Sequence, residues 1–389
     1  MARAVTAARA KKEKLHNYYD YSLLVLVIFI AAFGLVMIYS SSSYTAQTHA
    51  KYNYDAAYFL KKQAFSAILG VVAMLAVSKI DYRILMKRIP VIRITWATVL
   101  YLLACVLQFA VLFIGVEANG AKRWLQFGPI GFQPSEITKV AIIVFASYVI
   151  YLTPRMLDRF SGFLKVAVYC IVPIGLVLIE NMSTAIVLIL ITGGICFVAS
   201  RNKKYYIVVI VAAVAALGLF VLFGDAFRMQ RIEIWRNVET HPKGFQILQG
   251  LYAIASGGLF GTGLGESMQK LGFLPEAQND MIFSIICEEL GLFGAVCVIL
   301  LFLLMLWRFM VIANNAPDLY GALLVVGIMA HISIQVILNI AVVTNSIPNT
   351  GITLPFISYG GTSVLFLLSE MGLALSVSRG IRLDGPEDL

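Results

Sequence analysis

Residues 283–307 read "FSIICEELGLFGAVCVILLFLLMLW", an apolar run long enough to cross a lipid bilayer as a helix. The whole chain shares this character, because 60% of its 389 residues are hydrophobic and its mean hydropathy is +0.86. Only 13% of the residues are charged, about half of the roughly 25% that is usual in soluble domains. The five cysteines fall in apolar stretches, so neither a disulfide framework nor a metal site is indicated. The composition therefore predicts a membrane protein.

A scan for apolar runs of about 17–25 residues predicts ten membrane-spanning helices. We divide the apolar stretch 166–199 at "IENMST" because a single helix of that length would measure about 50 Å, against a hydrocarbon core of ~30 Å. The prediction is an all-α polytopic membrane domain over 21–380 with short tails at 1–20 and 381–389, and no signal peptide. The predicted spans lie near 21–43, 60–78, 94–115, 135–153, 166–180, 183–200, 205–223, 283–307, 320–342 and 357–379.

The distribution of Lys and Arg predicts the orientation of the chain. Most of the 30 basic residues lie on one side if both termini are cytoplasmic, as the positive-inside rule requires. The net charge of +9 is then a topology signal and a contact with anionic lipids, so we expect no nucleic acid partner. The longest connection, 224–282, is predicted to be an extracellular loop between helices 7 and 8. Its length makes it a functional candidate.

Glycines 257, 258, 261, 263 and 265 in this loop permit tight turns and close backbone approach. They favour either a contact with a bound group or a glycine-rich re-entrant turn at the membrane surface. They do not form a P-loop, because no GK[ST] follows.

Asp280 lies where the eighth helix is predicted to begin. Its carboxylate is either a functional acid or the N-cap of that helix, which would explain it completely. Glu288 and Glu289 lie about 12–13 Å deeper on a helix. At that depth ionisable groups face the protein interior, so we interpret both as structural carboxylates.

The stretch "NGAKRWLQFGPIGFQPSEITK" at 119–139 carries a second polar set on the same predicted side. Ser135 is the predicted N-cap of the fourth helix, and Glu136 is a possible ion-pair partner of Lys139 three residues later. Arg123 and Lys139 have the chemistry of an anion site, because a guanidinium and an ammonium both bind phosphate oxygens. Interfacial anchoring by snorkelling cations remains the alternative.

The third polar set lies in "NSIPNTGITLPFISYGGTSVLFLLSEMGLALSVSR" at 345–379. Its prolines and glycines break the backbone at the outer end of the tenth helix. Irregular backbone at membrane depth is tolerated only where protein or a water-filled cavity covers it, so the break is either a packing kink or part of a cavity. Because all three sets fall on one leaflet, we expect them to share one outer site.

Four stretches together resemble the SEDS family, the FtsW, RodA and SpoVE proteins. They are "DYSLLVLVIFIAAFGLVMIYSSSS", "NGAKRWLQFGPIGFQPSEITK", "GFLPEAQNDMIFSIICEELGLFG" and "IPNTGITLPFISYGGTS". The similarity runs in order over nearly the whole chain and is greater to FtsW and SpoVE than to RodA. It implies a ten-helix peptidoglycan glycosyltransferase of the bacterial cytoplasmic membrane, which polymerises lipid II for cell division or cell shape. It also implies a class B penicillin-binding protein as the crosslinking partner, together with other divisome or elongasome membrane proteins.

The resemblance assigns roles to particular residues. Asp280 corresponds to the essential acid of the family, and Arg123 and Lys139 correspond to functionally important basic residues. Glu276 and Lys270 are further candidates for substrate binding. The family also implies a loosely bound divalent cation, Mg²⁺ or Mn²⁺, for which Asp280 is a possible ligand.

Two positions depart from the family pattern. Asn181 stands where relatives often have an aspartate, which puts a role for that carboxylate in doubt. Thr350 stands where some division proteins have a lysine, so no role is carried over there.

The chemistry implied by the resemblance explains why a carboxylate is needed at position 280. The sugar of lipid II is α-linked to pyrophosphate and the polymer is β-linked, so one inversion suggests direct displacement by an acceptor hydroxyl that needs a base. We expect the lipid tail in a groove lined by residues of 94–115 and 135–153. The rival hypotheses are a lipid II flippase or transporter and a scaffold that only recruits the penicillin-binding protein.

Overall fold

The structure is a computed structural model that describes residues 18–90, 93–118, 121–127, 130–206 and 226–382. Within these ranges nine helices are long and apolar enough to cross a membrane. They coincide with nine of the ten predicted spans, whereas the predicted span 205–223 lies almost entirely outside the described residues. The nine are α2 (Tyr21–Thr48), α3 (Tyr58–Lys79), α4 (Trp96–Ile114), α5 (Pro134–Leu152), α6 (Phe160–Glu180), α7 (Met182–Ala199), α11 (Ile282–Asn314), α12 (Leu319–Val343) and α13 (Gly361–Arg379).

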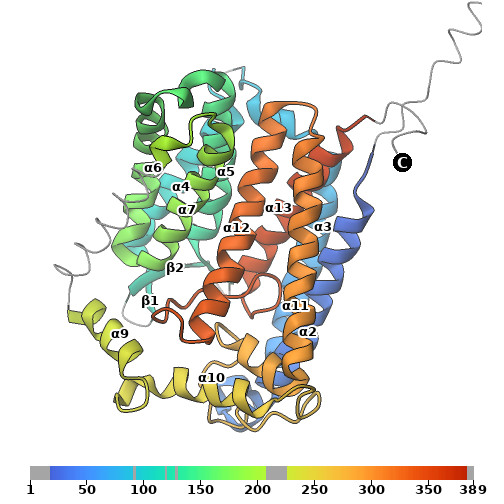
Figure 1. Ribbon diagram of the computed structural model, residues 1–389, viewed down its shortest axis with the longest axis vertical. Helices are drawn as coiled ribbons and strands as arrows, with labels where there is room; N and C mark the ends of the chain where they lie inside the picture. The colour runs from blue at the N-terminus through green and yellow to red at the C-terminus, as the bar shows by residue number, and fades with distance from the viewer. Residues whose placement is uncertain (1–17, 91–92, 119–120, 128–129, 207–225, 383–389) are drawn as a thin grey trace, which may run out of the picture.

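The long helices form one bundle in which α13 packs along α3, α12 lies between α11 and α7, and α4 packs on α5 (Figure 1). Small residues allow the closest approach, as in many membrane helix pairs. A Cβ atom on Gly372 of α13 would lie only 2.6 Å from the carbonyl oxygen of Met74 on α3. These two helices therefore pack with their backbones almost in contact.

Two polar contacts, which we call the clamps, join helices α2 and α11 at separate levels of the bundle. At one end the guanidinium of Arg308 pairs with the carboxylate of Asp20, with Nη2 and Oδ2 2.6 Å apart. At the other end the hydroxyl of Ser40 donates to Oε1 of Glu289 at 2.6 Å. The Tyr18 amide also donates to the carbonyl of Ile381 at 3.1 Å. The start of α2 and the end of α13 therefore lie at the same end of the bundle.

A three-stranded antiparallel sheet precedes α5, so the prediction of an entirely helical domain was wrong at this point. Its strands are β1 (Val116–Ala118), β2 (Ala121–Phe127) and β3 (Ile130–Phe132), in the order β1-β2-β3. Val116 pairs with Trp124, and Leu125 pairs with Phe132. The register buries Leu125 and leaves Gln126 exposed, the alternation expected of a sheet with one covered face.

The described part of the long connection before α11 contains two short helices and an irregular segment. These helices are α9 (Ala226–Arg236) and α10 (Phe245–Ser256), and Figure 1 shows both across one end of the bundle. Four 3₁₀ turns complete the described elements at Ala50–Tyr52, Tyr82–Met86, Pro154–Asp158 and Pro242–Gly244.

The glycine-rich turn, residues 257–265, packs against a break in α11. This helix is interrupted at Gly291, whose φ is 68° and ψ is −168°. The break frees the carbonyls of Glu288 and Glu289, which accept the amides of Thr262 and Gly263 at 2.9 and 3.0 Å. The glycines therefore serve a close approach to helix backbone, and the contacts favour the re-entrant turn over a contact with a bound group.

Candidate functional site

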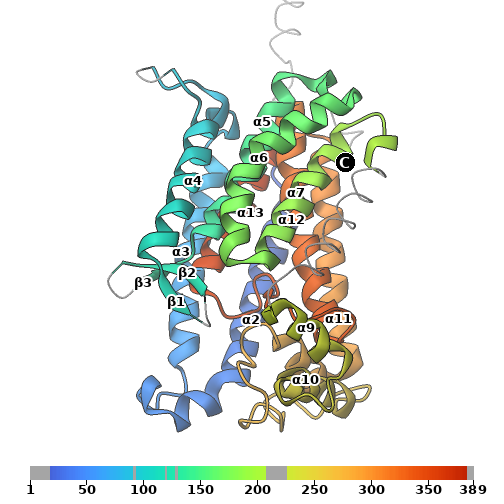
Figure 2. The same ribbon diagram turned by 90° about the vertical axis from the view of Figure 1, so that its left-hand side faces the viewer.

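A cavity of about 1210 Å³ opens at the end of the bundle that carries α9 and α10. Figure 2 shows the sheet on one side of this region and α9 on the other. The cavity wall includes Asp280, Arg123 and Lys139, so the predicted convergence of the three polar sets is confirmed. Cations outnumber carboxylates on this wall, which favours a ligand with negative charge. The charged residues among those described as lining it are Lys61, Lys62, Arg123, Glu136, Lys139, Arg231, Lys243, Glu276 and Asp280.

Asp280 is a buried carboxylate on this wall, with 8% of its surface exposed. Of the two alternatives for Asp280, the structure does not support the N-cap, because α11 begins at Ile282 and its N-cap residue is Met281 without a side-chain hydrogen bond. Its Oδ1 accepts a long hydrogen bond from Gln246, at 3.5 Å, and backbone amides of Asp280 and Met281 also donate to the carboxylate. Burial raises the pKa of Asp280 to about 6, and nearby Glu276 adds to the rise. The carboxyl is therefore poised to exchange a proton near neutral pH.

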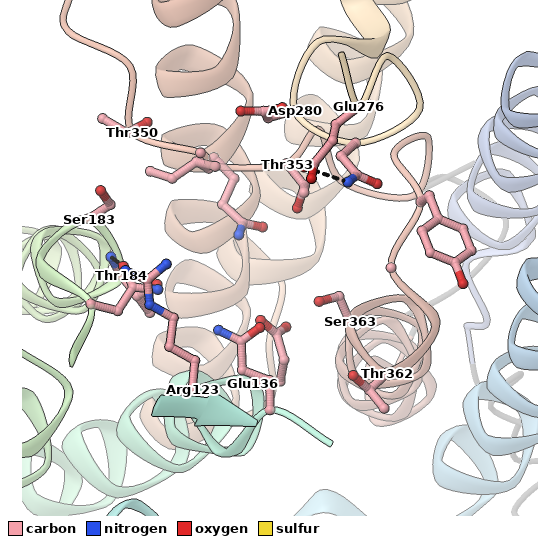
Figure 3. Close-up of a pocket in the computed structure, with 18 of the residues that line it drawn as sticks. Arg123, Glu136, Ser183, Thr184, Glu276, Asp280, Thr350, Thr353, Thr362 and Ser363 are labelled. Atoms are coloured by element: carbon pink, nitrogen blue, oxygen red, sulfur yellow. Dashed lines mark hydrogen bonds between the residues drawn. The ribbon is translucent and has the colours of Figure 1, made fainter. Parts of the chain in front are cut away.

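Arg123 extends from β2 and joins the sheet to the end of α6. Its Nε donates to the carbonyl of Glu180 at 2.9 Å, and the amide of Lys122 donates to Oε2 of the same glutamate at 2.8 Å. Burial lowers the pKa of Arg123, although a guanidinium stays protonated in proteins. The sheet thus holds a fixed positive charge opposite the loop that carries Asp280, as Figure 3 shows.

Lys139 lies in the first turns of α5 and pairs with Glu136 as predicted, with Nζ and Oε2 2.9 Å apart. Both side chains are almost fully buried. The N-cap residue of α5 is Gln133, followed by Pro134, so the prediction of Ser135 as the cap was wrong. An ammonium has three donors, so the pair leaves Lys139 able to bind a further acceptor in the cavity.

Arg231 of α9 also lines the cavity and was missed by the sequence analysis. Its Nη1 donates to the carbonyl of Asn349 at 3.0 Å, and Trp235 one turn later donates to the carbonyl of Asn345 at 2.9 Å. Burial and the charge of Arg123 lower the pKa of Arg231, while Asp280 opposes them. The available signal was an arginine and a tryptophan four residues apart, which share one face of a helix.

The structure separates the two remaining candidates. Glu276 lines the cavity, and its Oε2 accepts from Asn279 Nδ2 at 3.1 Å (Figure 3). Lys270 does not line it, because its ammonium is bound to Oε1 of Glu289 at 2.9 Å and to the carbonyl of Gly265 at 2.6 Å. The structure therefore does not bring Lys270 to the site.

Glu288 and Glu289 are structural carboxylates, as interpreted from their depth. The amide of Met268 donates to Oε1 of Glu288 at 2.9 Å, and Ser267 donates to its other oxygen. Glu289 is fully buried and joins Lys270 to Ser40 of α2. These two side chains hold the irregular loop against α2 and α11.

The broken backbone before α13 is part of the cavity wall, which decides against a simple packing kink. Gly351, Ile352 and Thr353 line the cavity. Asn339 of α12 fixes this segment, because its Nδ2 donates to the carbonyls of both Ile352 and Asp280 at 2.8 Å. One carboxamide therefore joins the two sides of the site.

The two departures from the family pattern both lie on the cavity wall. Asn181 lies at the break between α6 and α7, where its Oδ1 accepts the amide of Thr184 at 3.1 Å. It therefore caps α7, a role that an aspartate would fill equally well. The predicted groove for the lipid tail stays a prediction. The described residues of 94–115 do not line this cavity, although Gln108 and Val111 line a small neighbouring pocket together with Arg123 and Ser135.

No group of three or more His, Cys, Asp or Glu side chains that could hold a metal ion is found among the described residues. Asp280 and Glu276 are nevertheless two carboxylates on one cavity wall, and the charge of Glu276 raises the pKa of Asp280. Mg²⁺ usually keeps several waters and is bound by one or two carboxylates and by substrate phosphates. The residues present fit that loose mode of binding.

Comparisons with known proteins agree with this architecture. A family model described as "Cell cycle protein", of FtsW, RodA and SpoVE, matches residues 21–382. The chain is 38% identical to the probable peptidoglycan glycosyltransferase FtsW of Trichlorobacter lovleyi over 374 residues, covering 94% of each chain. It is 37% identical to stage V sporulation protein E of Bacillus subtilis over 377 residues, covering 92% of this chain and 97% of that one.

The fold is also similar to that of solved structures of a peptidoglycan synthase complex and of a rod shape determining protein. One is a chain from a structure described as "Structural coordination of polymerization and crosslinking by a peptidoglycan synthase complex", with a TM-score of 0.76 and 25% identity over 93% of this chain and 98% of that one. Another is the rod shape determining protein RodA of Thermus thermophilus, with a TM-score of 0.67 and 26% identity over 94% and 98%. The family match spans every helix described above, and the chain therefore belongs to the FtsW/RodA/SpoVE family.

Proposed function

We propose that this multi-pass membrane protein is a peptidoglycan glycosyltransferase that polymerises lipid II at the outer face of the bacterial cytoplasmic membrane, for cell division or cell shape. The names of its relatives support the activity. The observation that carries the proposal is that Asp280, Arg123 and Lys139 line one cavity. A carboxylate facing cations is the arrangement that glycosyl transfer from a pyrophosphate requires.

In the proposed reaction, the acceptor hydroxyl oxygen bonds to the anomeric carbon of the donor while the bond from that carbon to the pyrophosphate breaks. The hydroxyl proton passes to the carboxylate of Asp280. A pKa of about 6 leaves this carboxylate mostly ionised at neutral pH yet more basic than an exposed aspartate. A base of this strength suits proton removal in the transition state.

The leaving pyrophosphate needs positive charge and no proton donor. Arg123, Lys139 and Arg231 would supply it from the sheet, α5 and α9. Buried cations stabilise developing negative charge more strongly than they would in water. This explains why one carboxylate is enough here, whereas glycoside hydrolysis requires two.

The lipid tail is proposed to leave the cavity beside α3. Phe65 and Leu69 line the cavity and are also 64% and 45% exposed on the outside of the bundle. Leu365 of α13 continues this apolar wall. The cavity therefore meets the lipid-facing side of the bundle at a point where an acyl chain can remain in the bilayer.

A loosely bound Mg²⁺ or Mn²⁺ would be held by Asp280 and Glu276 together with the substrate. It would supply further positive charge to the pyrophosphate. In that case Asp280 acts as a metal ligand, and the two roles predict different behaviour. If Asp280 is only a ligand, Asp280→Asn, which keeps a ligating oxygen but no base, is expected to recover activity at high Mn²⁺, whereas loss of a base is not compensated by metal.

Polymerisation of lipid II by purified protein in nanodiscs tests the proposal. Asp280→Ala is expected to lower the rate by about 10²–10⁴-fold, the usual contribution of a general base. Glu266→Ala is the matched control, because Glu266 is an exposed carboxylate of the same loop and does not line the cavity. Unchanged polymer formation by Asp280→Ala would remove this residue from the mechanism.

The same purified protein, reconstituted into sealed vesicles, separates the enzyme from the flippase alternative. The cavity is built from one end of the bundle, whereas a transporter is expected to hold its site near the midplane with access to both faces. Translocation of labelled lipid II without polymer would favour the flippase. Crosslinking is assigned to a class B penicillin-binding protein partner, with other divisome or elongasome proteins beside it. The resemblance to a chain of a peptidoglycan synthase complex supports such a partner.

A further inference from the structure

The loop that carries Asp280 exposes a group of large apolar side chains. No charged residue occurs from Phe245 to Gly265. In the glycine-rich turn, Leu259, Phe260 and Leu264 are 65%, 81% and 55% exposed. An apolar group of this kind on a protein surface normally marks a contact with another molecule or with a membrane.

The two clamps between α2 and α11 indicate where the membrane lies. On α2, which is continuous, they are twenty residues apart, from Asp20 to Ser40. At 1.5 Å per residue the clamps are about 30 Å apart, which equals the thickness of the hydrocarbon core. The polar clusters at Asp20 and Ser40 therefore mark its two boundaries.

The glycine-rich turn crosses the boundary on the cavity side. The amide of Thr262 donates to the carbonyl of Glu288 at 2.9 Å, which puts this end of the turn at the boundary. The amide of Phe293 donates to the carbonyl of Leu259 at 3.0 Å. Phe293 follows the break and is fifteen residues from Arg308, about 22 Å at 1.5 Å per residue, whereas Ser40 is about 30 Å from Asp20. Leu259 therefore lies roughly 7 Å inside the hydrocarbon region.

Several backbone groups of the turn are paired with protein rather than left to solvent. Gly258 accepts the amide of Leu292 at 2.9 Å, and the amide of Gly261 donates to the carbonyl of Gly257 at 2.8 Å. With the bonds of Leu259, Thr262 and Gly263, these contacts satisfy backbone groups that water would satisfy at a solvated turn. Backbone exposed to lipid has no such solvent and must be paired internally.

The exposed side chains of the turn continue the lipid-facing surface of α11. Leu292 and Phe293, which follow the break in this helix, are 57% and 65% exposed. Their backbone bonds to Gly258 and Leu259 hold the turn directly beside this surface. The rest of the surface consists of Val296, Leu300, Leu303, Leu304 and Trp307.

We propose that the glycine-rich turn inserts into the leaflet on the cavity side, where Leu259 and Phe260 contact lipid acyl chains. The occupant of this apolar surface is the bilayer itself, because the turn lies at hydrocarbon depth, carries no charge, and has the carbonyls of Gly258 and Leu259 bonded to α11. The turn anchors the loop that carries Asp280 to the membrane at a second place besides α11. This inference does not depend on the reaction that the cavity performs.

Cysteine accessibility in nanodiscs tests the insertion. Phe260→Cys is compared with Glu266→Cys, an exposed position six residues along the same loop, using a membrane-impermeant maleimide. The unsubstituted chain gives the background from its five native cysteines. We expect labelling at position 260 to be at least about tenfold slower than at 266, because neither the reagent nor a thiolate enters hydrocarbon. Equal labelling rates would overturn the proposal.

A photoreactive benzoylphenylalanine at position 260 identifies what covers the turn. Insertion predicts adducts with phospholipid in protein that is free of any partner. Crosslinks within the chain would show that the turn folds back onto the protein, and the proposal would then fail. It would also fail if position 260 labelled rapidly in the isolated protein and became protected only when a transpeptidase partner was added.

Discussion

Replacing Asp280 by Asn is expected to stop polymerisation and at the same time make the protein more stable at neutral pH. The substitution keeps the size of the side chain and an oxygen that can accept from Gln246. It removes a negative charge that burial disfavours, which is the main cause of the raised pKa of Asp280. Function and stability should therefore change in opposite directions.

The size of the stability gain follows from the pKa shift. A shift from 3.8 to about 6 means that ionising Asp280 costs the folded state about 3 kcal/mol at pH 7 and about 1 kcal/mol at pH 4.5. Because the folded-state pKa is raised, the native chain loses this stability as pH rises through about 6. Asparagine stays neutral, so its advantage should grow by about 2 kcal/mol between those two pH values.

Unfolding in mixed micelles, followed at pH 4.5 and 7, measures this difference, and lipid II polymerisation measures the loss of the base. Glu266→Gln serves as the control, because it removes an exposed carboxylate of the same loop. An Asp280→Asn protein whose stability advantage does not depend on pH would contradict the buried, raised-pKa carboxyl. An active one would contradict its role as the base.

Two further predictions concern neighbouring parts of the structure. Arg231→Ala should move the acid limb of the polymerisation pH profile above about 6, because the charge of Arg231 lowers the pKa of Asp280. Arg231→Lys keeps the charge and is the control. An acid limb that moves to lower pH in Arg231→Ala would refute this effect of Arg231 on Asp280. Gly257→Ala should cost at least about 2 kcal/mol of unfolding free energy, because its Cβ would lie 1.9 Å from a carbonyl oxygen of α11. Gly193→Ala, where nothing lies within 4 Å, is the matched control, and similar stabilities for the two variants would be the contrary result.

The spans and the convergence of Asp280 with Arg123 and Lys139 could be predicted from sequence, because both depend only on where each residue lies along the membrane normal. Hydropathy fixes which segments cross a membrane, and the parity of crossings fixes which connections share a side. Asp280, Arg123 and Lys139 each lie near the end of a strongly apolar run. Their placement at one end of the bundle can therefore be predicted without knowing how the helices pack.

The features that the sequence analysis missed depend on three-dimensional packing or on weak local signals. The sheet was overlooked although "NG" and "GP" flank the run "AKRWLQF", and such dipeptides are turn signals between short strands. Arg231 reaches the cavity only because α9 docks on the segment before α13. Lys270 was wrongly grouped with the site because its partner Glu289 is nineteen residues away in sequence.

The single carboxamide of Asn339 has a mechanical consequence. It grips the carbonyl next to the acid and the carbonyl of Ile352 on the facing rim with two bonds of 2.8 Å. In the proposed reaction, a sugar that displaces the rim would therefore also move the backbone of Asp280. The fit of the substrate and the position of the proposed proton acceptor are thereby coupled through one side chain.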